Sequence, residues 1–453
     1  MQSNETELSK GQINKVGENL RASLFNKMEL SVEDLSKLQQ YRKEFKEPLR
    51  LASEELQRIM GKIDVEGIVT YRVKRIESIL SKLERQPAMQ LSRCNDIAGC
   101  RCILKNEKKV FQYLNELKSS NVLEIVTKKE SDGSSKEYIY DYIMNPKKNG
   151  YKSIHVICKC LNKVIEIQIR DDSQHAWATL VEITDSIYRT KIKEQDNDFD
   201  TGLKDFLRLY SKGKQLTEEE RKSINEILEK TKFIQKLVKT FKKNYPRIRK
   251  DWCELEEMPG NFYVFEVPQN NRPKYKIYED FAEAENAYFK TVTSEVVFSK
   301  TNVLMAYVQK KDFATVSKAY ANYFLVKHTL FDNLINIFSN DAHNDKVNQK
   351  SCRLAYLCAY FRIIINIDEI DACIDYNSRE ENIKRYDDWI IEIKNDISKS
   401  YELIHPKYNV SRLIFFGLLA DILKLFFKFL TFILKIRVYK LKTKLIEFFS
   451  SSQ

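Results

Sequence analysis

Residues 141–155 read DYIMNPKKNGYKSIH, and residues 163–170 read KVIEIQIR. The first segment begins with turn-forming and basic residues and ends in a β-strand pattern, and the second alternates isoleucines with polar residues. Because successive side chains of a strand point to opposite faces, the isoleucines are expected to face a core. Glu166, Gln168 and Arg170 would then share the other face, which is either a solvated edge or a site.

The two segments are predicted to pair as neighbouring strands, over 151–161 and 163–170, through a tight turn at Asn162. Tyr151 and His155 share one face of the first strand, and that face can coincide with the polar face of the second. An acid, an aromatic ring and an imidazole would then meet on one surface. An ordinary half-exposed hairpin is the alternative.

A cluster of cations precedes these strands, in a segment over 71–85 that is predicted as a basic helix or a helix start. Arg72, Lys74 and Lys82 are spaced by about one and two helical turns, with Ser78 between them, so several can face one point. Arginine supplies a bidentate fork and lysine a point charge, as expected around a polyphosphate. A solvated helix face is the alternative interpretation.

An acidic residue, Asp96, stands at the start of a short apolar strand predicted over 97–104, with Arg101 five residues later. Mg²⁺ in proteins is usually bound by one or two carboxylates together with phosphate oxygens. Asp96 is therefore a candidate Mg²⁺ ligand, and the alternative is a turn or cap aspartate.

Taken in order, these motifs resemble those of the RelA/SpoT synthetase family, over about residues 70–190. The residues that carry the resemblance are Arg72-Val73-Lys74, Ser78, Lys82, Asp96-Ile97-Ala98-Gly99-Cys100-Arg101, Asp141-Tyr142-Ile143, Pro146-Lys147, Asn149-Gly150-Tyr151-Lys152-Ser153-Ile154-His155, Glu166-Ile167-Gln168-Ile169-Arg170 and His175-Ala176-Trp177-Ala178. The resemblance implies a nucleotidyltransferase-like fold. It also implies transfer of the β,γ-pyrophosphate of ATP to a ribose 3′-hydroxyl, usually of GDP or GTP, which gives (p)ppGpp.

The resemblance also implies roles for single residues. Glu166 would activate the 3′-hydroxyl and share Mg²⁺ with Asp96, and Tyr151 would stack on the acceptor base. Arg72, Lys74 and Lys82 would hold the ATP phosphates, and Lys147, Asn149 and His155 would surround the acceptor. The full predicted substrate-binding set is Arg72, Lys74, Ser78, Lys82, Arg101, Lys147, Asn149, Tyr151, His155, Gln168 and Arg170.

The chain departs from the family pattern in three ways. Asp171 stands where the family usually has threonine, and residues 179–182 read TLVE in place of a Glu-x-Glu-His pattern. These changes leave the acceptor open: the 3′ end of tRNA or an adenosine nucleotide are alternatives, and a non-catalytic nucleotide sensor is a third. No histidine precedes His155, so we expect synthesis without the family's hydrolase activity.

The chain has 453 residues, a formal charge of +12 and an isoelectric point near 9.0. This charge suits an anionic partner such as nucleotide, RNA or a membrane surface, and it also suits a merely solubilising surface. Nine cysteines are scattered without a paired metal-binding pattern, which favours reduced thiols and a cytoplasmic protein.

We predict an α+β fold with four regions: helices over 1–70, a nucleotidyltransferase-like mixed sheet with flanking helices over 71–245, a small α/β domain over 255–340 and a helical region over 345–453. Further elements predicted inside them are a strand over 122–128, a loop over 130–136, and helices over 172–193, 216–243, 313–338, 351–366 and 379–403.

The tail over 413–436 is very apolar, yet it contains Asp421, Lys424, Lys428 and Lys435. In a helix these charges, together with Lys442, fall within a stripe roughly 60° wide. The tail could span a membrane in a homo-oligomer, lie at a membrane surface through residues 411–445, or pack under other helices.

Overall fold

The computed structural model describes residues 7–74, 76–129, 133–188, 202–237, 258–268, 274–294, 301–307 and 412–450, with single helical positions between 334 and 398. The chain divides into two compact units. The first comprises residues 1–147, 152–175 and 258–315, and the second comprises 148–151, 176–257 and 316–453. The helices predicted over 313–338, 351–366 and 379–403 lie almost entirely outside the described residues.

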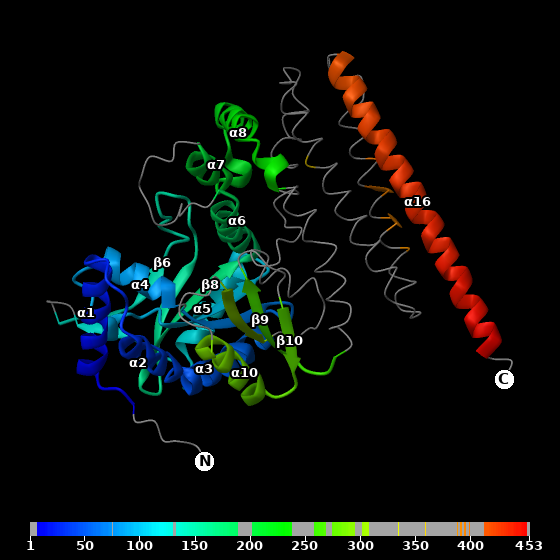
Figure 1. The fold of residues 1–453 in the computed structure, drawn as a ribbon. Helices are drawn as coiled ribbons and strands as arrows, with labels where there is room; N and C mark the ends of the chain where they lie inside the picture. The colour runs from blue at the N-terminus through cyan, green and yellow to red at the C-terminus, as the bar shows by residue number, and fades with distance from the viewer. Residues whose placement is uncertain are drawn as a thin grey trace. The chain divides into compact units, whose positions relative to one another are not determined.

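A six-stranded mixed sheet forms the centre of the first unit (Figure 1). Its strand order is β1-β2-β8-β7-β3, with β6 also paired to β7, and only β2 and β8 are parallel among these pairs. The strands are β1 (Ile68–Val73), β2 (Ala98–Leu104), β3 (Glu124–Ile125), β6 (Ile139–Asp141), β7 (Ile154–Cys160) and β8 (Lys163–Asp171). The predicted mixed sheet with flanking helices is confirmed.

One face of this sheet is covered by helices and forms the core. Ile165, Ile167 and Ile169 are fully buried on β8, beside Cys100 and Cys102 of β2. The helices of the first unit that precede or follow these strands are α1 (Lys10–Phe25), α2 (Val32–Lys43), α3 (Lys46–Ile63), α4 (Ile76–Arg85) and α5 (Glu107–Lys118). α3 and α5 pack on the isoleucine face, so the opposite face is left for polar side chains.

The segment over 71–85 was predicted as a basic helix or a helix start, and this prediction is wrong at residues 71–73. Residues 68–73 form β1 and only residues 76–85 form α4. The sequence IVTYRV is rich in β-branched and aromatic residues, which favour a strand, and β1 pairs along its whole length with β2. Arg72 therefore projects from a strand, while Lys82 projects from a helix.

Three smaller differences concern strands. Residues 135 and 136 of the loop predicted over 130–136 belong to β5 (Ser135–Glu137), which pairs antiparallel with β4 (Thr127–Lys129). The strand predicted over 122–128 is split between β3 and β4, and the strand predicted from Tyr151 begins only at Ile154. Gly150, in the turn before β7, has a φ of +90°, which favours glycine over other residues.

The described residues between 262 and 307 form a second, three-stranded sheet with one helix. Its strands are β9 (Phe262–Pro268), β10 (Lys274–Tyr278) and β11 (Thr301–Tyr307), in the order β10-β9-β11, and its helix is α10 (Phe281–Ser294). Val264, Ala284 and Tyr288 are buried in the same core as the first sheet. The described part of the predicted α/β domain thus shares the hydrophobic core of the first unit, while the boundaries of 1–70, 71–245, 255–340 and 345–453 stay predictions.

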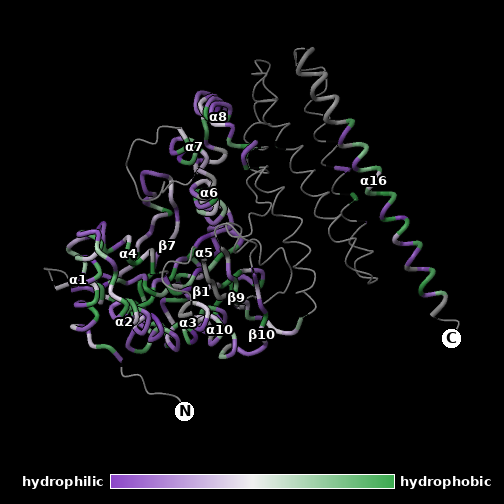
Figure 2. Tube along the Cα trace, viewed as in Figure 1, coloured by the Kyte–Doolittle hydropathy of each residue, from purple (hydrophilic) through white to green (hydrophobic). Residues whose placement is uncertain are grey.

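The described part of the second unit is mostly helical. It contains α7 (Leu203–Tyr210), α8 (Glu218–Thr231), most of α6 (Asp172–Tyr188) and the long α16 (Arg412–Ser450). Hydrophobic and hydrophilic residues alternate along α16 (Figure 2). Among the described residues, no helix combines the length and the hydropathy that crossing a membrane requires.

Candidate active site

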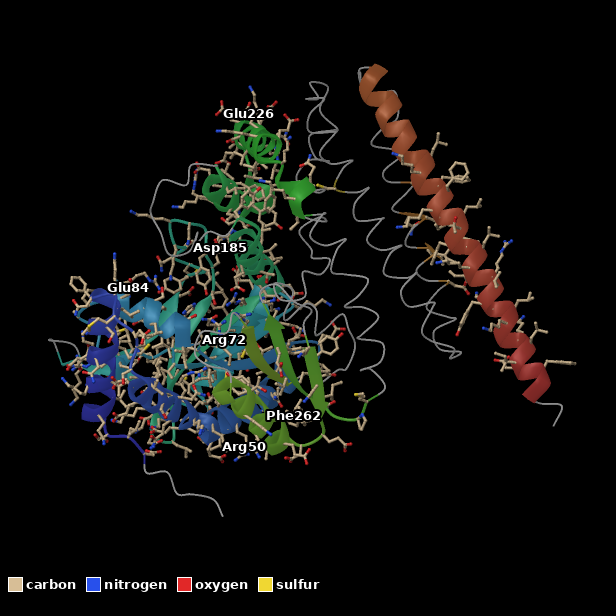
Figure 3. The ribbon with its side chains drawn as sticks, in the orientation of Figure 1. Arg50, Arg72, Glu84, Asp185, Glu226 and Phe262 are labelled. Carbon is tan, nitrogen blue, oxygen red and sulfur yellow. The ribbon has the colours of Figure 1, made fainter. Side chains whose placement is uncertain are left out.

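The register of the sheet brings a cation, a glycine and a carboxylate into one row. Arg72 of β1 is paired with Gly99 of β2, and Gly99 is paired with Glu166 of β8. A side chain on Gly99 would place its Cβ 3.0 Å from the carbonyl oxygen of Glu166. The row therefore has no side chain between its carboxylate and its cation, Arg72, which is labelled in Figure 3 and is exposed.

A second row of the same face runs beside the first. It places Arg101 of β2, Gln168 of β8 and His155 of β7 next to one another. The polar face predicted for β8 is thereby confirmed, and His155 joins it from the neighbouring strand. All these side chains face away from the isoleucine core.

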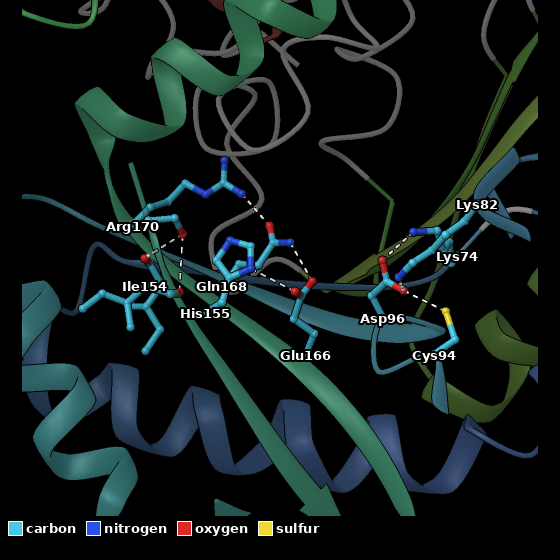
Figure 4. Close-up of polar contacts among 11 residues, drawn as sticks. Lys74, Lys82, Cys94, Asp96, Ile154, His155, Glu166, Gln168 and Arg170 are labelled. Atoms are coloured by element: carbon cyan, nitrogen blue, oxygen red, sulfur yellow. Dashed lines mark hydrogen bonds and ion pairs between the residues drawn. The ribbon is translucent and has the colours of Figure 1, made fainter. Parts of the chain in front are cut away.

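Glu166 is held by two hydrogen bonds (Figure 4). Its Oε1 lies 2.9 Å from Nδ1 of His155, and its Oε2 accepts a hydrogen bond of 2.9 Å from Nε2 of Gln168. Gln168 is in turn fixed by Arg170, whose guanidinium donates to its Oε1 at 2.6 Å. Burial alone would raise the pKa of Glu166, but the bonds from His155 and Gln168 leave it below its ordinary value. An ionised, oriented carboxylate results, which is the form that accepts a proton.

Asp96 is surrounded by cations. Its carboxylate forms ion pairs with Lys74, directly after β1, and with Lys82 of α4, and it accepts a bond from the thiol of Cys94 at 3.0 Å. Burial would raise the pKa of Asp96, but the charge of Lys74 and these bonds hold it well below its usual range. Asp96 raises the pKa of Glu166, as expected for two neighbouring carboxylates on one face (Figure 4).

The donor set of this face fits a hard divalent cation. Asp96 and Glu166 supply carboxylate oxygens, and Mg²⁺ commonly takes one or two carboxylates and completes its coordination with substrate phosphates and water. Among the described residues, no group of three or more histidine, cysteine or acidic side chains is arranged for a metal.

The remaining predicted site residues belong to the loop before β7 and to α4. The ammonium of Lys147 lies 4.4 Å from the ring centre of Tyr142, and that ring meets His155 edge-on at 5.2 Å. Ser78 is half-buried on α4. Asn149 and Tyr151 belong to the second unit, where Asn149 accepts a hydrogen bond from the amide of Tyr151.

Two residues near the carboxylates were not predicted from the sequence. Cys94 contacts Asp96, and no sequence pattern marks it. Tyr142 was quoted as part of a motif without a role, yet it lies between Lys147 and His155, and its ring stacks on Tyr140. The alternation of tyrosines at 138, 140 and 142 was the signal that could have identified this aromatic surface.

Asp171, the departure from the family pattern, caps α6. Its Oδ1 accepts from the backbone amide of Gln174 at 2.8 Å, and the side chain of Gln174 accepts from the amide of Asp171. Threonine is also a good N-cap, so this substitution preserves a helix start. His175 and Trp177 are buried, and the Trp177 indole donates to the carbonyl of Leu207, which indicates a packing role for that ring.

Comparison with known proteins gives a family match for the part of the chain that contains this site. Residues 71–193 match the family model described as a region found in RelA / SpoT proteins. GTP pyrophosphokinase YwaC of Bacillus subtilis is 35% identical over 122 residues, which are 24% of this chain and 53% of that protein. Guanosine-3′,5′-bis(diphosphate) 3′-pyrophosphohydrolase of Borreliella burgdorferi is 29% identical over 185 residues, which are 37% of this chain and 26% of that protein.

The chain thus spans about half of the first of these relatives and a quarter of the second. The crystal structure of small alarmone synthetase 2 from Bacillus subtilis is 30% identical, covering 37% of this chain and 89% of that one, with a TM-score of 0.28. The conclusion from the family match and the motifs is that residues 71–193 of this chain form a RelA/SpoT-family domain.

Proposed function

We propose that the RelA/SpoT domain transfers the β,γ-pyrophosphate of ATP to the ribose 3′-hydroxyl of GDP or GTP. The observation that carries this proposal is the pairing of an ionised Glu166 with the Asp96–Lys74–Lys82 cluster on one sheet face. A relative that is named a GTP pyrophosphokinase supports the choice of a guanosine acceptor.

The proposed step needs one base. Glu166 accepts the proton of the 3′-hydroxyl, and the 3′-oxygen forms a bond to the β-phosphorus of ATP. The bond between that phosphorus and the oxygen bridging to the α-phosphate breaks, and AMP leaves with the electron pair. His155 and Gln168 keep the Glu166 carboxylate oriented, because each holds one of its oxygens.

Phosphoryl-type transfer depends mainly on positioning and charge neutralisation. Lys74 and Lys82 are bound to a single carboxylate in the free protein, and a triphosphate would compete with Asp96 for them. Arg72 is exposed on the same face and adds a planar fork for phosphate oxygens. Asp96 and Glu166 would hold Mg²⁺, which neutralises charge on the transferred group when bound.

The acceptor is proposed to bind beside His155. Tyr142 and Lys147 present an aromatic ring and a cation there, the groups that contact a base and an anionic phosphate. Tyr151 is proposed to stack on the acceptor base, and Asn149, Ser78 and Arg101 to complete the substrate contacts. We also propose that the chain lacks hydrolase activity.

The test is AMP release from ATP and Mg²⁺ by the full chain with GDP, GTP, an adenosine nucleotide or deacylated tRNA as acceptor. AMP with a guanosine acceptor is the expected result. AMP release only with tRNA or an adenosine nucleotide would support the proposed transfer but assign it a different acceptor. Binding of ATP without AMP release in any mixture would refute the enzyme and leave a nucleotide sensor.

A further inference from the structure

The long helix α16 carries a row of exposed apolar side chains outside the catalytic domain. Its members recur every three or four residues over 423–448 and are between 44% and 68% exposed: Leu423, Phe427, Leu430, Leu434, Val438, Leu441, Leu445 and Phe448. At about 100° per residue they fall within an arc of roughly 80° and extend over about 38 Å. We call this row the apolar stripe.

The apolar stripe is distinct from the face that α16 buries within the protein. Phe429, Phe432 and Ile436 are at most 9% exposed and lie on the other side of the helix. Exposed apolar rows of this length are unusual in monomeric proteins. A helix that packs on one side and presents such a row on the other is therefore expected to bind a partner through the second side.

Cations follow both borders of the apolar stripe. Lys424, Lys435 and Lys442 are exposed along one border, and Arg437 and Lys444 are exposed along the other. Between residues 412 and 450 the sequence has eight lysines and arginines but only two acidic residues. Whatever covers the stripe must therefore accept apolar side chains at its centre and positive charge at both sides.

A second copy of α16 meets only the first of these requirements. In a helical dimer the residues that flank an apolar seam face those of the partner, and stable pairs place opposite charges there. Two copies of α16 would place lysines against lysines. A bilayer of anionic lipids meets both requirements, because acyl chains accept the apolar face and headgroups attract the cations.

We propose that α16 lies in the surface of an anionic lipid bilayer, with the apolar stripe inserted at the level of the headgroups. The helix lies parallel to the surface, in agreement with the absence of a membrane-crossing helix among the described residues. This surface is independent of the transferase chemistry, and its test does not require activity.

The test is co-sedimentation of the full chain with vesicles of phosphatidylcholine alone and with 30% phosphatidylserine added. We expect binding to the anionic vesicles only, weakened by salt. Leu434→Gln with Leu441→Gln should weaken it at least tenfold. The matched control, Val32→Gln with Val65→Gln, changes two exposed valines of the first unit and should bind as the unchanged chain does.

Exchange of Lys435 and Lys442 for glutamine should weaken vesicle binding by about fivefold for each cation. Failure of the unchanged chain to bind anionic vesicles would overturn the proposal, as would equal binding by the stripe variant. Sedimentation velocity tests the main alternative, a contact between subunits. An unchanged chain that forms an oligomer, does not bind vesicles and is dissociated by the stripe variant would assign the stripe to that contact.

Discussion

Exchange of Glu166 for glutamine tests the proposed chemistry most directly, because it removes the base and keeps the shape of the side chain. Glu166 has a lowered pKa, so it is ionised throughout the neutral range and no protonation step limits its use. A general base contributes about 10²–10⁴-fold to a rate. A carboxylate with a lowered pKa is a weak base, so we expect a loss of about 10²–10³-fold in kcat, or roughly 2.7–4.1 kcal/mol.

The same exchange has a predictable effect on folding. Both oxygens of Glu166 accept hydrogen bonds, from His155 and from Gln168, whereas a glutamine side chain offers one acceptor oxygen. One donor then meets the new amide nitrogen, which costs about 1–3 kcal/mol of unfolding free energy. Turnover must therefore be measured well below the unfolding midpoint of the variant.

AMP release from ATP with GDP measures kcat, and titration with a non-hydrolysable ATP analogue measures binding. The matched control is Glu124→Gln, an exposed glutamate on β3 of the same sheet, which should leave both quantities unchanged. Nucleotide binding within about threefold of the unchanged chain, with kcat lowered a hundredfold or more, is the expected pattern. Near-normal kcat in Glu166→Gln would show that another group takes the proton.

Three further exchanges test the geometry of the site. Gly99→Ala should lower the unfolding free energy by about 1–3 kcal/mol in chemical denaturation, because the new Cβ would meet the carbonyl oxygen of Glu166 at 3.0 Å. The control Gly61→Ala, which has open space in α3, should raise the unfolding free energy by roughly 0.5–1 kcal/mol. The pKa of Asp96 is lowered in the folded protein, so its carboxylate stabilises the fold fully at pH values above the ordinary carboxyl pKa near 4. This stabilisation is lost progressively as the pH falls below about 4 toward the lowered pKa. The difference in melting temperature between the unchanged chain and Asp96→Asn should therefore shrink between pH 5 and pH 3, and a constant difference would contradict the ion pairs. Asp171→Thr should keep the unfolding free energy within about 1 kcal/mol and leave the acceptor preference unchanged, whereas Asp171→Ala should lower the unfolding free energy by about 1 kcal/mol. A changed acceptor preference in Asp171→Thr would show that this residue contacts substrate.

The polar face of β8 could be predicted from the sequence because it depends on alternation alone. Ile165, Ile167 and Ile169 are buried, and Glu166 and Gln168 face the opposite side, as a strand requires. The contacts between strands depend on register, which the sequence of one strand does not contain. The row from Arg72 through Gly99 to Glu166 needs β2 parallel to β8 and antiparallel to β1, and only the folded sheet supplies that information.

The cation cluster shows that residues grouped by helical spacing can meet although part of the predicted helix is a strand. Arg72, Lys74 and Lys82 were grouped by helical spacing, but the chain leaves β1 at Val73 and starts α4 at Ile76. Lys74 and Lys82 nevertheless meet, because both pair with Asp96, which lies in the turn before β2. Lys74 follows a strand and Lys82 lies on the next helix, so the two lysines meet without sharing one helix face. Asp96 holds the two ammonium groups in place in the folded protein. If the proposed triphosphate binds there, part of the entropy cost of ordering these groups is already met during folding.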